Sequence, residues 1–252
     1  MDVAEVVRSL YPSLVEGDVG AVLGAFAPRA TVDTPLGGRQ QPTEWVANEG
    51  AWLSAHAART EEVNRVVSDA RIAHELILWV TIDGEEREVP VMLVADIREG
   101  RVRDLRVYHS TYPINGSHMV RSPLLDPDPS LEPAEPVGAY HDALAAGDAE
   151  AIDPLFEEDG YVREPAGSEF AHSGDERREW YRAIMSAGSL PLDLCTVTDD
   201  GVTLVFEYRA DTWGRFSIPA QCGAAAYERA PSGKIAAARI YDDFEPPPEL
   251  FE

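Results

Sequence analysis

Two carboxylates and a tyrosine in the C-terminal half of the chain have the types and positions to do acid–base chemistry. Glu164 stands directly before a Pro-Ala-Gly turn, Tyr140 lies seven residues before Gly147, and Asp193 interrupts the apolar run LPLDLCTV. A carboxylate inside an apolar strand either points to solvent or faces a polar site. If all three side chains face one cavity, one carboxylate can remove a proton while the other acid protonates a leaving oxygen.

Other chemistries lack the residues they need. The histidines, at 56, 74, 109, 118, 141 and 172, show neither HxxxH nor HxH spacing. No GxGxxG, GxxxxGK[ST] or GxSxG motif is present. Cys195 and Cys222 are too few for a disulfide framework or a zinc site. We therefore expect no metal, no bound nucleotide and no other cofactor.

Composition limits the partners that the chain can have. Its 252 residues carry a formal net charge of −24, from 45 acidic and 21 basic side chains. A surface of this charge repels phosphate backbones and anionic lipid. The sequence begins MDVAEVVRSL, without the pattern of a signal peptide, and no apolar run is long enough to cross a membrane. We expect a cytoplasmic protein with no nucleic-acid or membrane partner.

The sequence contains an internal repeat. LYPSLVEGDVGAVLGAFAPRATVDTPLGG in the first half corresponds to YHDALAAGDAEAIDPLFEEDGYVREPAG in the second. Aligning the two Gly-Asp pairs also aligns Phe26 with Phe156 and Val32 with Val162, with no gap. The copies end alike, in EGRVRDLRVYHS and SGKIAAARIYDD. A repeat of this kind predicts two copies of one supersecondary unit.

Each copy is expected to be an α+β domain. Helical spacing of apolar residues comes first, then a Gly-Asp break with the aspartate placed to cap a second helix, then a short strand, a third helix and a run of strands. This order predicts a curved, mostly antiparallel sheet wrapped over three helices, forming a cone that can hold a small molecule. We place the first domain at 1–115, a proline-rich linker at 116–133 and the second domain at 134–252.

The second copy resembles the NTF2-like, ketosteroid-isomerase-like (SnoaL-like) superfamily from about Val137 to Asp243. The most specific stretch is YVREPAGSEFAHSGDERREWY, which is similar to the strand, turn and helix that present the family's carboxylate to its pocket. The resemblance implies that Glu164 is the catalytic base and Tyr140 a hydrogen-bond donor to a developing oxyanion. It also places Tyr241, on the last strand, on a pocket wall. The isomerases' second acidic donor is missing, because it should lie near Ala225 in QCGAAAYE.

An Asp/Glu pair with tyrosine help, in a tandem layout, is similar to the epoxide-opening cyclases and hydrolases of polyether biosynthesis. This resemblance implies an enzyme that opens an epoxide of an apolar, oxygenated, polyketide-like intermediate to a cyclic ether or a diol. Two alternatives stay open. One is a double-bond isomerase, aldol cyclase or dehydratase with Glu164 as its single base, and the other is a non-catalytic binding or scaffold module.

The first copy departs further from this pattern. Thr34 stands where the carboxylate should be, and neighbouring Asp33 reaches the pocket only if a bulge intervenes. Weaker candidates in this copy are, besides Asp33, the residues Glu62 (or its neighbour Glu61), Tyr11, Tyr108 and His109. We expect the second copy to be the active one. The two copies are expected to pair through their sheets as an internal pseudo-dimer, which could associate further into a homo-oligomer.

Overall fold

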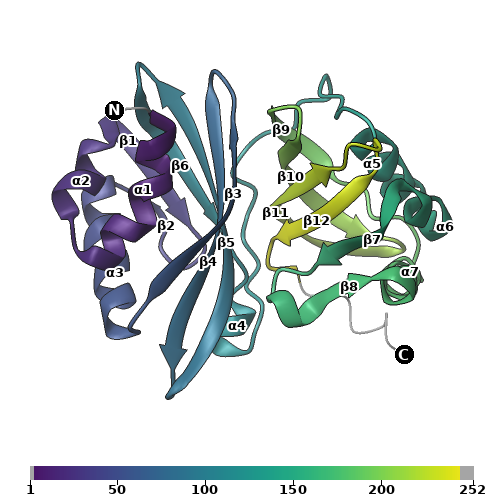
Figure 1. Cartoon of the computed structure of the whole chain (residues 1–252), viewed down its shortest axis with the longest axis horizontal. Coiled ribbons are helices and arrows are strands. Elements are labelled where there is room, and N and C mark those ends of the chain that lie inside the picture. Colours follow the sequence, from purple (N-terminus) through teal and green to yellow (C-terminus); the bar gives the residue numbers. More distant parts are fainter. Residues whose placement is uncertain (1–2, 245–252) are drawn as a thin grey trace. The chain divides into compact units, whose positions relative to one another are not determined.

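The protein, described here by a computed structural model over residues 3–244, divides into two compact units. The units are Met1–Ser117 and His118–Glu252, and we refer to them as the first and second domains. Each domain is an α+β unit with one six-stranded sheet (Figure 1). The outer ends of the predicted domains, at residues 1–2 and 245–252, lie outside the described residues.

The first domain starts with two helices, continues with two strands and a third helix, and ends with a run of four strands and a short fourth helix. Its helices are α1 (Val3–Glu16), α2 (Val19–Gly24), α3 (Pro42–Ala55) and α4 (Tyr112–Asn115). Its strands are β1 (Phe26–Thr34), β2 (Gly38–Gln40), β3 (Arg59–Val67), β4 (Arg71–Ile82), β5 (Glu85–Arg98) and β6 (Arg101–Tyr108).

The second domain largely repeats this order. Its helices are α5 (Val137–Ala146), α6 (Ala149–Ile152), η1 (Asp153–Leu155), η2 (Ser168–Phe170) and α7 (Gly174–Ile184). Its strands are β7 (Phe156–Arg163), β8 (Ala171–Ser173), β9 (Asp193–Asp199), β10 (Thr203–Trp213), β11 (Phe216–Arg229) and β12 (Ile235–Tyr241).

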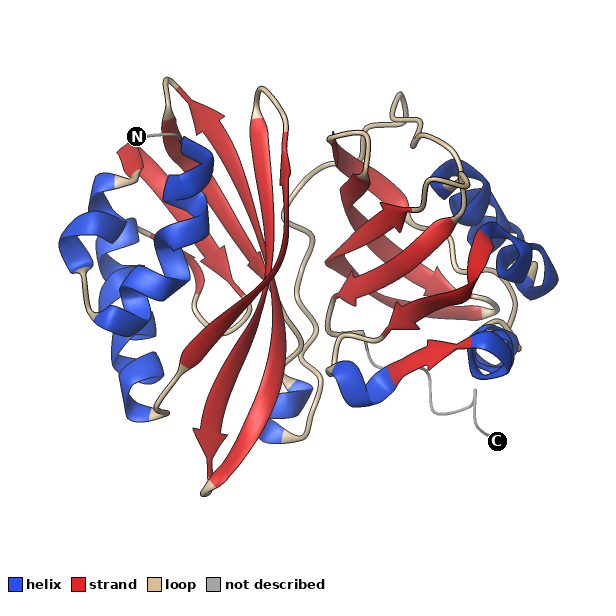
Figure 2. Ribbon diagram, in the orientation of Figure 1, coloured by secondary structure: helices blue, strands red, loops and turns tan. Residues whose placement is uncertain are grey.

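The two sheets have the same topology. The strand orders are β2-β1-β6-β5-β4-β3 and β8-β7-β12-β11-β10-β9. All neighbours are antiparallel except one pair in each sheet, where the first long strand runs parallel to the last, β1 beside β6 and β7 beside β12. Figure 2 shows each sheet as a twisted layer, with α1, α2 and α3 against one face of the first sheet and α5, α6 and α7 against one face of the second. The predicted curved sheet over helices is therefore confirmed in both copies.

The Gly-Asp pairs end the first helix of each copy as predicted. Gly17 and Gly147 have φ of 76° and 71°, a conformation that glycine adopts without a steric penalty. The aspartates that follow cap the next helix: Asp18 accepts a hydrogen bond from the backbone N–H of Ala21 at 2.9 Å, and Asp148 accepts one from that of Ala151 at 3.1 Å. The two glycines thus share one structural role and the two aspartates share another, as the alignment of the repeat predicts.

Each domain buries its own apolar core between helices and sheet. In the first core, the indole of Trp45 on α3 is fully buried against Tyr11 and Phe26, with ring centroids 6.1 and 5.9 Å away. In the second core, aromatic rings from α5, α7, β10 and β11 take up much of the interior. The two cores thus contain different aromatic side chains, and the polar groups beside them also differ between the domains.

The segment expected to be a linker falls almost entirely within the second unit and makes hydrogen bonds with strands β9 and β11. The backbone N–H of Asp128 donates to the carbonyl of Leu194 on β9 at 2.8 Å, and that of Cys222 on β11 donates to the carbonyl of Arg121 at 3.1 Å. Leu131 packs against the second core. We retain 116–133 as a proposed linker, with 1–115 and 134–252 as the proposed domain limits.

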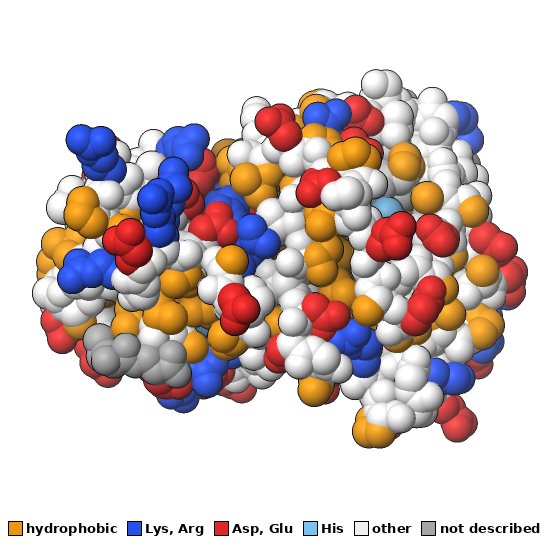
Figure 3. Space-filling model, turned by 90° about the horizontal axis from the view of Figure 1, so that it is seen from above, with side chains coloured by type: hydrophobic (Ala, Val, Ile, Leu, Met, Phe, Trp, Pro, Cys, Tyr) orange, Lys and Arg blue, Asp and Glu red, His pale blue; other side chains and the backbone are white. Residues whose placement is uncertain are grey.

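The surface is acidic without a concentrated basic region on the face seen in Figure 3, where acidic side chains are spread among basic and apolar ones. Over the described residues, no helix has the length and apolar character that a membrane crossing needs.

We predict that Trp45→Ala destabilises the first domain by roughly 3–5 kcal/mol, because it removes a large ring and leaves a cavity. Chemical denaturation followed by tryptophan fluorescence and circular dichroism measures this loss. Val19→Ala is the matched control, since Val19 is half exposed in the same domain, and we expect it to change the free energy of unfolding by less than about 0.5 kcal/mol. Equal effects of the two substitutions would contradict the assigned core.

Candidate active sites

Glu164 lies at the end of β7, paired with a histidine. Val162, two residues earlier, belongs to the second core and pairs with His172 on β8. The Nε2–H of His172 donates to Glu164 Oε1 at 2.7 Å, and the imidazole stacks on Trp180 of α7, with ring centroids 5.5 Å apart and planes 19° apart. Both side chains are partly exposed, at 32% for Glu164 and 24% for His172. A carboxylate held by an imidazole at an accessible position has the arrangement of a general base.

Three tyrosines form a buried cluster in the interior of the second domain, which we call the phenol cluster: Tyr140, Tyr181 and Tyr227. The hydroxyl of Tyr181 donates to that of Tyr140 at 3.0 Å, and the rings of Tyr140 and Tyr227 lie 5.0 Å apart. Burial raises the pKa of Tyr140 to about 12, against the opposite effect of hydrogen bonds from the other two phenols. Burial also raises the pKa values of Tyr181 and Tyr227 well above their usual range. All three phenols are therefore neutral near pH 7.

A second carboxyl group, Asp242, lies half-buried just beyond β12. The hydroxyl of Tyr208 on β10 donates to its Oδ2 at 2.6 Å. Burial raises the pKa of Asp242 to about 6, although the hydrogen bond from Tyr208 lowers it. The strand between them carries Gly223, and a Cβ there would lie 2.6 Å from Cζ of Tyr208 and 2.7 Å from Cβ of Asp242. Only glycine leaves room for this pair.

The parallel pairing of β7 with β12 brings Asp242 and Glu164 to one end of the sheet. Val162 pairs with Ala238 and Arg163 with Arg239. Continued by one residue, this register sets Glu164 beside Ile240, two residues before Asp242. Val162, Ala238 and Tyr208 all belong to the core on the helix side of the sheet. Both carboxyl groups therefore lie on the interior side, at the same end of adjacent strands.

Asp193 does not join this group. Its neighbours Leu192 and Leu194 both pack in the core, so the alternation of the strand turns Asp193 away from it. Its side chain is 54% exposed and lies 3.2 Å from Nε of Arg209 in an ion pair. Of the two orientations that the sequence left open, the structure has the solvent-facing one, and the predicted Glu164–Asp193 pair is not formed.

Tyr241 and Tyr108 lie on the opposite face of their sheets from the core. Tyr241 pairs with Ala224, whereas the core residue Ala225 pairs with Ile240, which packs against the core. The Tyr241 ring lies under the guanidinium of Arg163, 5.1 Å from the ring centroid to Cζ. Tyr108 follows the core residue Val107 on β6 and alternates away from it. The expectation that Tyr241 lines the pocket wall is therefore wrong, because it has the wrong parity on the last strand.

The first domain has a cavity of about 250 Å³ at its corresponding end. Thr34, Gln40 and Asn48 line it, together with Glu49 on α3 and His109. The hydroxyl of Tyr11 donates to Glu49 Oε1 at 3.0 Å, and burial raises the pKa of Glu49 although this hydrogen bond lowers it.

His109 follows β6 as Asp242 follows β12, and its Nδ1 lies 3.0 Å from the carbonyl oxygen of Ser110. Two of the weaker candidates, Tyr11 and His109, thus lie in or next to one cavity together with the half-buried carboxyl group of Glu49. The first domain keeps a polar site at the position of the second-domain pair.

The other first-domain candidates lie elsewhere. Asp33 pairs with Arg106 in a regular stretch of β1, since the irregularity in this strand lies earlier, between Phe26 and Thr31. It therefore points away from Thr34, which lines the cavity, and the bulge that Asp33 needed is absent from this stretch. Glu61 accepts a hydrogen bond from the indole of Trp79 at 3.1 Å. Glu62 faces α1 and belongs to a different cavity, described below.

Asp242, His172 and Glu49 were not among the site residues predicted from the sequence. Asp242 had an available signal, because Ala238, Ile240 and Asp242 fall on one face of a strand with period two. That signal was ambiguous, since both faces of AAARIY are apolar enough to be buried. His172 and Glu49 had no sequence signal beyond their residue types. Within residues 3–244, no three His, Cys, Asp or Glu side chains gather in a way that could hold a metal ion.

Comparison with known proteins agrees with this architecture. The family model of the SnoaL-like domain matches residues 137–238. No curated protein matches the chain. Solved structures are similar to part of the chain, and three of them follow.

An NTF2-like protein of unknown function from Burkholderia pseudomallei is 22% identical, with a TM-score of 0.41, over 45% of this chain and 95% of that one. A candidate SnoaL-like polyketide cyclase from Jannaschia is 12% identical, with a TM-score of 0.39, over 42% and 84%. TerC, co-crystallised with polyporic acid, is 14% identical, with a TM-score of 0.41, over 45% and 95%. The part of the chain that matches the SnoaL-like domain, residues 137–238, carries Glu164, His172 and the phenol cluster.

Proposed function

We propose that the second domain is a general acid–base enzyme that acts on an apolar, oxygenated small molecule, by opening an epoxide to a cyclic ether or a diol. The observation that carries this proposal is the location of Asp242 and Glu164 at one end of adjacent strands, on the interior side of the sheet. Two carboxyl groups in different surroundings suit this chemistry, because one must take a proton while the other gives one.

The roles follow from the surroundings of each group. Glu164, hydrogen-bonded to His172 and partly exposed, takes the proton of a hydroxyl group or a water molecule. The resulting oxygen nucleophile attacks an epoxide carbon, and the carbon–oxygen bond of the ring breaks. Asp242, whose raised pKa keeps much of it protonated in mildly acidic solution, gives its proton to the oxygen that is released. One proton is taken up and one is given, so exchange with solvent restores both groups.

The surrounding residues fit a substrate that is mainly apolar. The rings of Phe206, Tyr208 and Tyr227 pack together in the core beside Asp242, with the ring of Phe206 5.7 Å from Tyr208 and 5.1 Å from Tyr227. Phe244 packs edge-on against Tyr208 at 6.0 Å. A polyketide-like intermediate, with an apolar carbon skeleton and a few oxygens, suits aromatic surroundings of this kind.

The phenol cluster favours a second candidate reaction. Two phenols interact with the hydroxyl of Tyr140, which arranges it as a donor toward a developing enolate oxygen. With Glu164 as the base, that arrangement would serve a double-bond isomerase, an aldol cyclase or a dehydratase.

Substitution of either carboxyl group tests the proposal. We expect Glu164→Gln and Asp242→Asn each to lower kcat/KM by roughly 10²–10⁴ on an aryl-substituted epoxide with an internal hydroxyl group, because each removes one proton-transfer partner. Asp193→Asn is the matched control and should leave kcat/KM unchanged, since Asp193 is exposed and paired with Arg209. Products formed in ¹⁸O-labelled water distinguish a diol from a cyclic ether.

The pattern of losses separates the two candidate reactions. Loss of activity in Asp193→Asn but not in Asp242→Asn would overturn the proposed pair. If epoxides are not turned over, but an apolar enone exchanges its α-hydrogens with deuterated solvent in a reaction that needs Glu164, the isomerase-type candidate replaces epoxide opening.

Asp242 also predicts a pH dependence of stability. Its folded-state pKa of about 6 lies above the usual value for aspartate, so at pH between about 4 and 6 the folded chain holds a proton that the unfolded chain has released. The contribution of this group to the free energy of unfolding therefore falls as the pH rises through this window, by at most about 3 kcal/mol. Denaturation of the wild type and Asp242→Asn at both ends of the window measures the difference, and parallel curves would contradict the assigned burial.

A further inference from the structure

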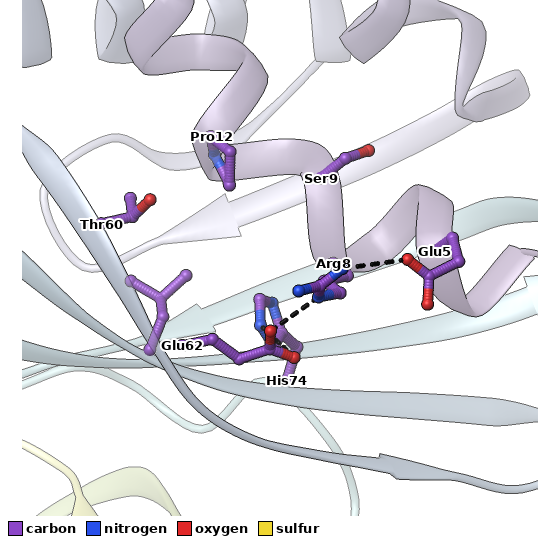
Figure 4. Close-up of a pocket in the computed structure, with 8 residues that line it drawn as sticks. Glu5, Arg8, Ser9, Pro12, Thr60, Glu62 and His74 are labelled. Atoms are coloured by element: carbon purple, nitrogen blue, oxygen red, sulfur yellow. Dashed lines mark hydrogen bonds and ion pairs between the residues drawn. The ribbon is translucent and has the colours of Figure 1, made fainter.

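The first domain contains a second cavity, of about 360 Å³, between helix α1 and strands β3 and β4. Figure 4 shows Arg8 on α1 reaching toward Glu62, beside His74 on the sheet, with Ser9 and Pro12 farther along the helix. The lining residues of this cavity differ from those of the cavity around Glu49 and His109. We call it the His74 cavity.

His74 is the unusual residue of this site. It is 2% exposed, and neither ring nitrogen makes a hydrogen bond within the part of the chain that the structure describes. The nearest carboxylate oxygen, Oε1 of Glu62, lies 3.9 Å from Nε2, beyond hydrogen-bond distance. A buried polar group without a partner costs about 1–3 kcal/mol. The native fold therefore keeps a destabilising group at the wall of a cavity.

The position does not require a histidine for packing. Met92 on β5 pairs with both Tyr108 and Glu75, and Ala224 on β11 pairs with both Tyr241 and Glu207. Tyr108 and Tyr241 hold the same place in the two matching segments EGRVRDLRVYHS and SGKIAAARIYDD, so the registers make Glu75 equivalent to Glu207. His74, one residue before Glu75, is therefore equivalent to Phe206. Phe206 fills the same position in the second domain with an apolar ring and contacts the ring of His141 at 6.0 Å. An aromatic hydrocarbon thus serves this point of the fold where no hydrogen bond is needed.

The charges around the cavity are paired. Arg8 binds Glu62 at 2.6 Å and Glu5 at 3.2 Å, and Arg65 forms an ion pair with Glu5. Two cations facing two carboxylates leave no net charge to attract an ionic ligand.

The remaining walls combine apolar groups, from Pro12 and Leu76, with the hydroxyl-bearing Ser9 and Thr60. Burial lowers the pKa of His74 to about 4, so its imidazole is neutral near pH 7, with one N–H donor and one nitrogen acceptor. A hydroxyl group can donate to the bare nitrogen or accept from the N–H.

We propose that the His74 cavity is a second small-molecule site, which binds a neutral, mainly apolar molecule through a hydrogen bond between its hydroxyl group and His74. The site is independent of the proposed catalytic pair, because it lies in the other domain and uses none of its residues. It needs no chemical step, and binding satisfies a polar group that the fold leaves unpaired.

The test uses the full chain with 2-naphthol and with naphthalene, which has the same carbon skeleton but lacks the hydroxyl group. Binding at this cavity is followed by NMR through the ring signals of His74 and the methyl signals of Leu76. We expect 2-naphthol to bind there roughly 2–10 times more tightly than naphthalene, the effect of one net hydrogen bond. His74→Phe, which installs the residue of the second domain, should bring this ratio close to one while naphthalene still binds.

Three results would overturn the proposal: no response of His74 or Leu76 to either probe, equal affinities of the two probes in the wild-type protein, or an unchanged preference in His74→Phe. The first two measurements use only the wild-type chain, so they decide the matter even if the variant does not fold. Catalytic assays of the second domain are expected to be unaffected by His74→Phe, which separates this site from the proposed enzyme.

Discussion

The parallel pairing between the first and last long strands of each sheet is the constraint on which the functional geometry depends. All other strand neighbours in the sheets are antiparallel and nearly all are close in sequence, whereas β7 and β12 are separated by most of the domain. Because parallel strands end on the same side, the residues that follow them meet. Glu164 after β7 and Asp242 after β12 therefore lie at the same end of adjacent strands. The same pairing of β1 with β6 sets Thr34 and His109 around the first-domain cavity.

The repeat and the helix ends could be predicted from the sequence because they depend on local interactions. A glycine with positive φ and an aspartate that caps the next helix act within a few residues, so their signature survives in both copies. The position of Glu164 at a strand end could be predicted too, from its place before the Pro-Ala-Gly turn.

The orientations of Asp193 and Tyr241 follow from strand parity, which a single residue reverses. The alternation of Leu192 and Leu194 indicated that Asp193 points outward, so this information was present in the sequence. For Tyr241 it was absent, because both faces of β12 are buried and β12 also contains an irregularity, between Ile235 and Ala237 in its pairing with β7. Asp242 could be identified only once the pairing of its strand with β7 and the room left by Gly223 were known.

The two domains share one backbone plan but place their costly polar groups differently. The second domain fills its interior with aromatic rings and keeps a half-buried carboxyl group next to Tyr208, whereas the first keeps a half-buried carboxyl group on α3 and, at the position of Phe206, a buried imidazole without a hydrogen bond to any of the described residues. A fold selected only for stability would replace such groups by apolar ones of similar shape. At one such position the second domain carries the apolar Phe206 and the first carries His74, so the backbone accepts either residue. The histidine at that position is the group with which the proposed ligand of the first domain would pair, and the two copies carry different sets of polar groups.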